Sequence, residues 1–190
     1  MRERARLPKL AQPDRLILDL DPDPALTWPT LVDAALLTRT LLQELGLPAL
    51  LKTTGGKGLH VVVPLKPIRG WDDVKAFARA LAQRLVHVAP DRFTATATKA
   101  RRSGKVFVDY LRNGEGATFV AAYSLRAREG APVAMPIDWD ELTPRRELRG
   151  DHFNIGNAIR RAAQSRALWR AADRSAVAIT QAMRKRIGVE

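Results

Sequence analysis

At residues 16–22 the chain reads Leu16-Ile17-Leu18-Asp19-Leu20-Asp21-Pro22. Three apolar residues lead into two carboxylates spaced two residues apart, and a proline ends the run. In a β-strand, residues i and i+2 point to the same face, so Asp19 and Asp21 would project into one small volume. Two like charges held that close are costly unless a cation lies between them, and hard divalent cations take such oxygen ligands. Asp and Pro are also common in turns, so this stretch alone leaves an acidic turn open.

Composition narrows the class of protein. The chain has 190 residues, 46% of them hydrophobic, which suffices for one domain with a core. Cysteine is absent, which excludes disulfides and thiolate metal sites and fits a reducing cytoplasm, the location that we predict. No apolar run reaches membrane-spanning length, and the N-terminus lacks a signal-peptide core, so no membrane partner is expected. The net charge of +12 predicts a polyanionic partner, most commonly nucleic acid.

Working outward from the first strand, hydrophobic periodicity and turn residues predict the remaining elements. Thr27 is a plausible helix N-cap and Gly46 a helix stop. The expected elements are strand 16–21, helix 27–46, strand 48–53, strand 59–65, helix 71–88, an extended segment 93–98, strand 106–111, strand 118–123, an irregular stretch 131–136, a helical turn 138–142, and Arg-rich helix from Asn154 onward.

From residue 16 to residue 111 the order is β-α-β-β-α-β, the ferredoxin-like arrangement that RRM domains also use. We therefore predict an α/β (α+β) fold with a mixed central sheet, in which the first strand lies between the third and the fourth. The chain divides into a basic N-terminal arm (1–15), a core (16–150) and basic C-terminal helices packed on that core (151–190).

This topology supplies a third carboxylate. Asp109 lies in the otherwise apolar strand Val106–Leu111, next to Asp19 and Asp21 on the central strand. A lone Asp in such a strand is usually paired with a nearby base or placed at a strand edge, and Arg112 or the pair Arg101 and Arg102 could supply that base. Three carboxylates on adjoining strands, however, can also hold one or two Mg²⁺ or Mn²⁺ ions. Two such ions stabilise the attacking and the leaving oxygen of a phosphoryl displacement.

A glycine-rich turn, Thr54-Gly55-Gly56-Lys57-Gly58-Leu59-His60, precedes the third strand. Exposed amides in such a turn form an anion nest, and Lys57 adds a point charge, so a triphosphate cradle is predicted beside the carboxylates. The spacing is not that of a Walker A loop, and an ordinary hairpin turn is the alternative. Arg102 and Arg126 could reach the same face and neutralise phosphate, although single arginines are usually solvated surface residues.

The motifs Leu18-Asp19-Leu20-Asp21-Pro22, Thr54–Val61, Val106–Asn113 and Tyr123–Ala127, followed by Trp139–Leu142, occur here in one order. Together they closely resemble the polymerase domain of bacterial DNA ligase D, of the archaeo-eukaryotic primase superfamily. The resemblance runs from about Pro13 to about Leu142. It implies a metal-dependent nucleotidyltransferase of non-homologous end joining that extends DNA ends or fills gaps. DNA and nucleoside triphosphates would be its partners, with a ligase domain or an end-binding repair protein as further ones.

Carried over by position, the resemblance assigns roles to individual residues. It implies that Asp19, Asp21 and Asp109 bind two Mn²⁺ or Mg²⁺ ions and are catalytic. The residues that would bind the incoming nucleotide are Thr54, Gly55, Lys57, His60, Arg102 and Arg126, with Arg112 as an addition. Two departures stand out: Thr54 replaces the usual serine and keeps its hydroxyl, and few residues precede Asp19, so the chain resembles the catalytic half of that domain.

Three alternatives remain open on the sequence. An RRM-like RNA-binding module would share the strand order, but the stacking aromatics of that family are missing and Asp19 and Asp21 would repel RNA. An Asp-x-Asp phosphatase with Asp19 as nucleophile would need a small hydroxyl or β-branched residue where Asp23 stands. An inactive remnant that only binds partners is the third.

Overall fold

The computed structural model describes residues 10–143 and 148–189, except for the side chains of residues 166, 168 and 170–173. The strands are β1 (Arg15–Pro22), β2 (Leu50–Thr53), β3 (Leu59–Pro64), β4 (Phe93–Thr94), β5 (Val106–Asp109) and β6 (Pro136–Ile137). The helices are α1 (Trp28–Glu44), α2 (Trp71–Val88), α3 (Ala158–Arg174) and α4 (Gln181–Arg186), and 3-10 turns are η1 (Lys99–Arg102), η2 (Leu111–Asn113) and η3 (Trp139–Glu141).

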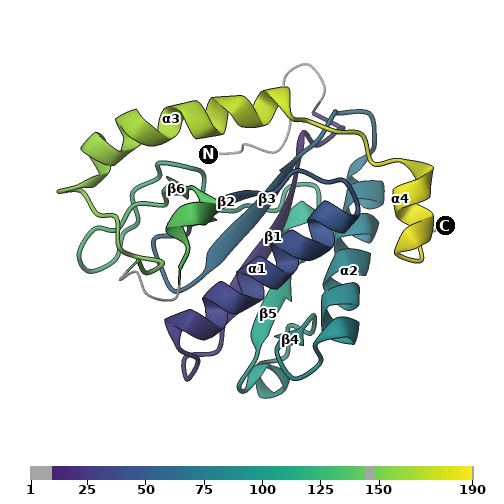
Figure 1. Cartoon of the computed structure of the whole chain (residues 1–190), viewed down its shortest axis with the longest axis horizontal. Coiled ribbons are helices and arrows are strands. Elements are labelled where there is room, and N and C mark those ends of the chain that lie inside the picture. Colours follow the sequence, from purple (N-terminus) through teal and green to yellow (C-terminus); the bar gives the residue numbers. More distant parts are fainter. Residues whose placement is uncertain (1–9, 144–147, 190) are drawn as a thin grey trace.

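Within the described residues, six strands form one sheet in the order β4-β5-β1-β3-β2-β6. β1 lies between β3 and β5 and pairs with both in antiparallel fashion. β4 runs parallel to β5, which makes the sheet mixed. The predicted α/β fold, the mixed sheet and the central place of the first strand are therefore confirmed (Figure 1).

The alternation of residues in β1 explains why the two faces of the sheet differ. Leu16, Leu18 and Leu20 are fully buried and belong to the core that α1 and α2 complete. Successive side chains of a strand point to opposite faces, so Asp19 and Asp21 lie on the face away from these helices. Figure 1 shows α1 and α2 side by side against one face of the sheet. The helices thus bury one face and leave the other for the carboxylates.

The predicted helix boundaries are close to those observed. The Thr27 hydroxyl caps α1 by accepting a hydrogen bond from the Thr30 amide, at 3.4 Å. Gly46 follows the helix with a φ of +70°, a left-handed conformation that glycine adopts without steric cost. In α2, Asp72 and Asp73 occupy the first turn, where negative charge complements the helix dipole.

The predicted strand 118–123 is wrong, because this segment has no strand pairing. Tyr123 has a φ of +66°, outside the range of a strand, and its amide donates to the Ala134 carbonyl at 2.6 Å. β5 ends at Asp109 instead of Leu111, since residues 111–113 turn into η2. Of the predicted extended segment 93–98 only β4 pairs. The stretch 131–136, predicted to be irregular, ends in the edge strand β6.

The C-terminal part begins with a turn where a helix was expected. Asn154 accepts a hydrogen bond from the Gly156 amide through its side chain, at 2.9 Å, so α3 begins only at Ala158. α3 contacts β6, and Arg184 of α4 pairs with Asp73 of α2 at 3.2 Å. Residues 1–9 of the predicted basic arm lie outside the described residues. No helix in the described part of the chain has the length and hydropathy that a bilayer crossing demands.

Candidate active site

A row of ionisable residues crosses four neighbouring strands. Lys52 of β2 is opposite His60 of β3, His60 is opposite Asp19 of β1, and Asp19 is opposite Asp109 of β5. Directly opposed residues of antiparallel strands share a face and have neighbouring side chains. Lys52 is completely buried and His60 nearly so. The strand register alone therefore brings a cation, an imidazole and two carboxylates into one line.

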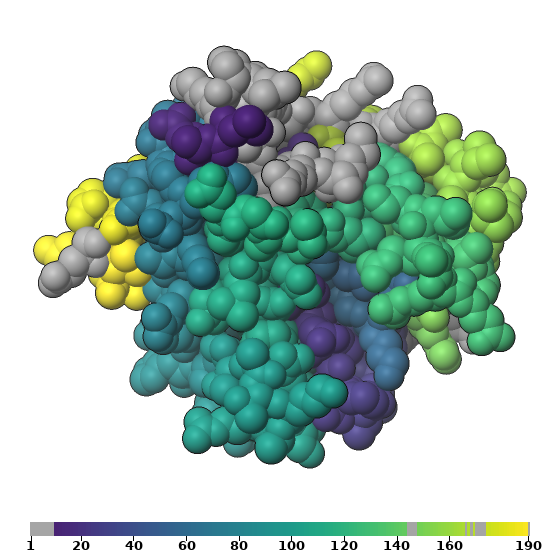
Figure 2. All heavy atoms as spheres, turned by 180° about the vertical axis from the view of Figure 1, so that it is seen from behind, coloured from purple at the N-terminus to yellow at the C-terminus, as the bar shows by residue number. Residues whose placement is uncertain are grey.

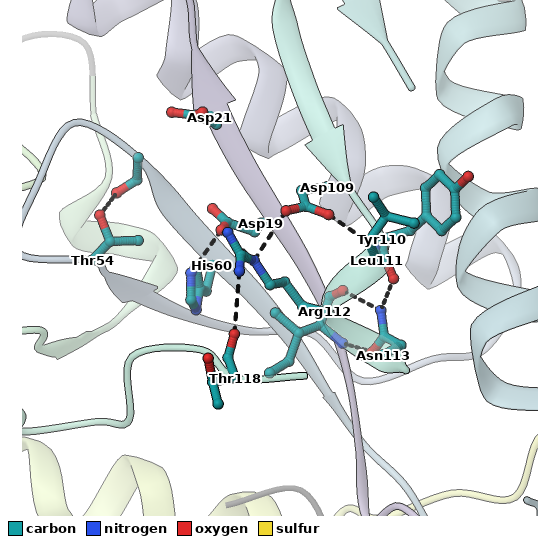
Figure 3. Close-up of polar contacts among 12 residues, drawn as sticks. Asp19, Asp21, Thr54, His60, Asp109, Tyr110, Leu111, Arg112, Asn113 and Thr118 are labelled. Atoms are coloured by element: carbon teal, nitrogen blue, oxygen red, sulfur yellow. Dashed lines mark hydrogen bonds and ion pairs between the residues drawn. The ribbon is translucent and has the colours of Figure 1, made fainter. Parts of the chain in front are cut away.

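Asp19 and Asp109 both direct an oxygen at one guanidinium group. The Arg112 Nε lies 3.0 Å from Oδ2 of Asp109 and 3.7 Å from Oδ2 of Asp19 (Figure 3). The second oxygen of Asp109 accepts a hydrogen bond from the Leu111 amide at 2.8 Å. The predicted base beside Asp109 is thus present, and it holds two carboxylates together.

Asn113 fixes the position of the turn that carries Arg112. Its side chain accepts a hydrogen bond from the Ile17 amide and donates one to the Ile17 carbonyl, both at 2.8 Å. A buried amide side chain thereby pairs with β1 beyond the end of β5, in the way that another strand residue would. Arg112 is held next to β1 as a result.

Asp21 lies farther along β1 than Asp19 and has a different partner. The Arg102 Nη1 is 3.5 Å from Oδ2 of Asp21, and the Arg102 guanidinium stacks 3.8 Å from the centre of the Phe107 ring. The stacking is a cation–π contact that orients the guanidinium. In Figure 3 the Asp21 side chain projects to the same side of β1 as that of Asp19, nearer the end of the strand, and it is about half exposed.

The two carboxyl groups of β1 have pKa values displaced in opposite directions. Burial by itself would raise the pKa of Asp19, but His60, Arg112 and Lys52 together lower it below its ordinary value. Burial and the negative charges of Asp19 and Asp109 raise the pKa of Asp21, against the effect of Arg102. Asp21 therefore experiences the repulsion expected of clustered carboxylates, and a bound cation would relieve it.

His60 faces Asp19 from the adjacent strand, with its Nε2 3.4 Å from Oδ2 of that carboxylate. Burial, followed by the charge of Lys52, lowers the pKa of His60 to about 4, against the effect of Asp19. The imidazole is therefore neutral at pH 7, and the contact is not an ion pair. This arrangement places His60 where it orients a carboxylate.

The glycine-rich turn is packed tightly against β1. The Thr54 hydroxyl donates a hydrogen bond to the Gly58 carbonyl at 3.0 Å, which closes the turn. A Cβ atom on Gly58 would lie 2.6 Å from the Leu20 carbonyl oxygen, closer than real Cβ contacts allow. Gly55 has a φ of +65°, which also favours glycine. The turn therefore lies directly beside the strand that carries Asp19 and Asp21.

Two arginines enclose the other side of the turn. Arg126 donates from Nη1 to the Thr54 carbonyl at 3.0 Å, and its Cγ would be only 2.7 Å from a Cβ on Gly55. The Nη1 of Arg128 would lie 2.8 Å from a Cβ on Gly56. Both glycines thus allow a guanidinium to approach the backbone, and positive charge gathers at the turn.

A cavity of about 690 Å³ opens between the carboxylates and the turn. Figure 2, which views the opposite side from Figure 1, shows a hollow in which β1 and residues near 55 lie between the teal and green segments. The residues named from the sequence that line the cavity are Asp19, Asp21, Thr54, Lys57, His60, Arg112 and Arg126. Asp109, Arg102 and Gly55 do not line it; the first two adjoin it through Arg112 and Asp21.

The segment that presents Arg126 is strained and supported from α3. Tyr123 is not glycine, yet it adopts a φ of +66°. Its hydroxyl lies 3.2 Å from the Ser165 hydroxyl, which is fully buried in α3 and also contacts Met135. Strained residues persist where the surrounding structure holds them, often at functional sites.

Sequence reasoning missed three residues of this region. Lys52 stands two positions before Thr54 in a predicted strand, and the strand order would have placed it opposite His60. Arg128 follows Arg126 by two positions and lines the cavity. Asn113 ends the motif Val106–Asn113, and nothing in its sequence context indicates its pairing with β1.

Whether this site fits a divalent metal depends on its donor atoms. Asp19, Asp21 and Asp109 offer the carboxylate oxygens that Mg²⁺ and Mn²⁺ prefer. Across residues 10–143 and 148–189, however, no three acidic or histidine side chains already surround one point as ligands do. The Arg112 guanidinium lies between two of the carboxylates and compensates their charge. Its side chain is 43% exposed, and its further hydrogen bond, from Nη1 to the Thr118 carbonyl at 3.3 Å, is exposed too. The donor set therefore fits such ions once Arg112 moves away.

Comparison with known proteins agrees with these features. The family model described as the LigD primase-polymerase domain matches residues 2–169. A Pseudomonas aeruginosa protein, the multifunctional non-homologous end joining protein LigD, is 56% identical over 138 residues, which are 73% of this chain and 16% of that protein. The Mycolicibacterium smegmatis protein of the same name is 40% identical over 140 residues, or 74% of this chain and 18% of that protein.

A solved structure extends the comparison to three dimensions. The polymerase domain from Mycobacterium tuberculosis ligase D, in complex with DNA, superimposes with a TM-score of 0.79 at 34% sequence identity. The match covers 87% of this chain and 56% of that one. The chain thus spans less than a quarter of the curated relatives and about half of the solved domain. On the family model, the identities and the shared fold, the chain belongs to the LigD primase-polymerase domain family.

Proposed function

We propose that this chain is a metal-dependent nucleotidyltransferase that adds nucleotides to DNA ends or gaps in non-homologous end joining. The observation that carries the proposal is the cavity in which the carboxylates of β1 adjoin a cationic, glycine-rich turn. Polymerisation needs both parts. One part promotes attack of a primer 3′-hydroxyl on the α-phosphate, which breaks the bond between the α- and β-phosphates. The other part holds the β- and γ-phosphates of the incoming triphosphate, which leave together as pyrophosphate.

In this proposal Asp19, Asp21 and Asp109 hold two Mn²⁺ or Mg²⁺ ions. When bound, such ions activate the attacking hydroxyl and stabilise the charge that develops on the phosphates. His60 keeps Asp19 oriented, because its neutral imidazole faces that carboxylate from β3. Arg112 leaves the space between the carboxylates and becomes available to a phosphate group.

The triphosphate would lie along the turn. Lys57, Arg126 and Arg128 line the same cavity and supply positive charge to the phosphate oxygens. Arg102 adjoins the cavity through its pair with Asp21 and would add further positive charge. Thr54 and Gly55 act through the shape of the turn, since the Thr54 hydroxyl already bonds to Gly58.

The relatives' names and the DNA in the solved structure support DNA as the polymer substrate. The net charge of +12 agrees with such a partner. Ribo- and deoxyribonucleoside triphosphates are both included in the proposal. A ligase domain or an end-binding repair protein is proposed as the wider context, because the relatives are much longer proteins.

The test is templated extension of a gapped DNA duplex with Mn²⁺ and ribonucleotides. We expect extension by the wild-type chain, none with a chelator, and none by Asp19→Ala or Asp109→Ala. Asp33→Ala is the matched control, because Asp33 is exposed on α1, on the helix-covered side of the sheet. Full activity of either site variant would overturn the assignment of the carboxylates.

Binding measured by calorimetry distinguishes the remaining hypotheses about function. Mn²⁺-dependent binding of a nucleoside triphosphate, without extension, would indicate an intact nucleotide site that does not engage DNA by itself. Absence of nucleotide binding would favour the inactive remnant. Chelator-insensitive RNA binding would favour the RRM-like module, whose strand order this fold shares.

A further inference from the structure

Besides its contact with β1, the glycine-rich turn is held by a segment far away in the sequence. The Gly55 amide donates a hydrogen bond to the Gly150 carbonyl at 2.9 Å. A Cβ atom on Gly150 would lie 2.2 Å from the Gly56 carbonyl oxygen and 3.0 Å from the Lys57 carbonyl carbon. These neighbours are backbone atoms, which cannot rotate aside as the end of a long side chain can. Gly150 therefore allows a contact that no other residue permits.

This segment, residues 148–153, is held in the core at both of its ends. Leu148 and Phe153 are buried in the hydrophobic core on either side of Gly150. The Phe153 carbonyl accepts a hydrogen bond from the Val133 amide at 2.7 Å. Because both ends are held, the segment has little freedom to move back from the turn. An added side chain at Gly150 would therefore push the turn itself.

The contact also determines where backbone groups of the turn point. Gly150 lines a neighbouring cavity of about 570 Å³ and not the one that contains the carboxylates. The Gly56 carbonyl oxygen faces Gly150, so it is directed away from the place proposed for the triphosphate. A carbonyl turned toward phosphate oxygens would repel them. The Gly55 amide is occupied by Gly150, so the anion nest predicted for this turn loses one of its donors.

We propose that Gly150 is a positioning residue for the triphosphate site, which holds Gly55 to Lys57 in the conformation that presents Lys57 to the cavity. This inference rests on the proposed function and adds a residue that acts through the turn without touching the nucleotide. The turn is then held by two contacts: Gly58 packs against β1, and Gly56 packs against residues 148–153.

The decisive variant is Gly150→Ala, with Gly70→Ala as the matched control. Gly70 precedes α2 with a φ of −73°, and a Cβ there would meet nothing within 4 Å. Binding of ATP and of AMP is measured by calorimetry with Mn²⁺, and the extension reaction supplies KM and kcat. We expect Gly150→Ala to weaken ATP binding and raise KM at least about tenfold, because a displacement of about 1 Å misplaces Lys57. AMP binding and the control should stay within about twofold of the wild type, on the same reasoning.

Equal ATP affinity in Gly150→Ala and the wild type would overturn the inference, and so would equal losses for ATP and AMP. A second measurement does not depend on the variant folding. Hydrogen exchange of the wild-type Gly55 amide should be slow without nucleotide, and a free exchange rate would overturn the contact itself. If wild-type protein fails to bind ATP with Mn²⁺, the proposed function fails, while the exchange rate still decides whether Gly150 holds the turn.

Discussion

The row of ionisable residues (Lys52, His60, Asp19 and Asp109) and the glycine-rich turn adjoin one cavity, yet the chain positions them in different ways. Asp19, His60 and Asp109 are placed by strand register, and their neighbours are the regular ladder of a sheet. The turn is placed by irregular contacts with Arg126 and Gly150, which come from loops. The row is therefore as rigid as the core beneath it, whereas the turn depends on distant segments. Substitutions in the row and substitutions around the turn should therefore have different effects on stability and on activity.

Among the variants that follow, the largest effect is expected from Asp21→Asn, which changes a carboxylate of β1 next to the row and leaves the turn intact. Extension should fall about 10³-fold, the upper range for losing one group that stabilises charge in a transition state. The metal-free protein should be at least as stable as the wild type, because burial and repulsion from Asp19 and Asp109 already raise the pKa of Asp21. Thermal unfolding with Mn²⁺ or a chelator checks this. The metal-induced rise in Tm should disappear in Asp21→Asn and persist in Asp33→Asn, and an unchanged rise would remove Asp21 from the metal site.

The pH dependence of the free energy of unfolding tests the environment of His60 in the row. Burial and Lys52 lower the pKa of His60 from 6.5 to about 4. Between these values the unfolded chain binds a proton that the folded chain does not, so the free energy of unfolding rises with pH. The free energy of unfolding rises by on the order of 3 kcal/mol. The rise is complete above the pKa of His60 in the unfolded chain and absent below its pKa in the folded chain.

Denaturant unfolding from pH 4 to pH 7, with a chelator present, measures this slope. His60→Gln should flatten it, and His87→Gln, at an exposed position in the last turn of α2, should leave it unchanged. Equal slopes in the wild type and His60→Gln would show that the imidazole is not held neutral by the row.

Gly58→Ala tests the boundary between the two regions. The added Cβ would lie 2.6 Å from the Leu20 carbonyl oxygen and 3.7 Å from Oδ1 of Asp19. Pushing the turn away from β1 by about 1 Å should lower kcat/KM about 10²-fold. Steady-state extension kinetics are the measurement. Gly114→Ala is the control, because its φ is −81° and its nearest contact would be 3.6 Å. Similar kinetics for both variants would mean that the turn need not rest on β1.

The smallest effect is expected from Ser165→Ala, which removes a distant support of the turn region. Loss of the 3.2 Å contact with the Tyr123 hydroxyl should cost about 1 kcal/mol of stability and raise KM for the nucleotide a few-fold. Thr38→Val removes another buried hydroxyl, bonded to the Ala34 carbonyl within α1. It should cost similar stability without changing KM. An equal change in KM in both variants would show that the contact from α3 does not support the nucleotide site.

The sequence predicted the row better than the turn, for physical reasons. Alternation in Leu16 to Asp21 and the β-α-β-β-α-β order determine which residues lie side by side, so Asp109 could be found beside Asp19. Strand 118–123 was mispredicted because β-formers such as Phe119 and Val120 suggest pairing, whereas the left-handed backbone of Tyr123 prevents it.

Gly150 had no sequence signal at all. Its contact with Gly56 joins residues far apart in the chain, and no local pattern in the sequence indicates it. The same holds for Asn113, whose pairing with Ile17 joins residues far apart in the chain. Contacts that follow from regular strand pairing could thus be predicted from the sequence. Contacts that depend on one side chain, as at Asn113, or on the absence of a side chain, as at Gly150, could not.

The central place of β1 also has a consequence for synthesis of the chain. β1 is translated before both of its neighbours in the sheet, β3 and β5. Until then an apolar strand has both edges unpaired, the condition under which nascent chains associate wrongly. Asp19 and Asp21 add charge to the end of that strand, as gatekeeper residues do beside aggregation-prone segments. The residues proposed for catalysis would then also act against wrong association of the nascent chain, before the site has formed.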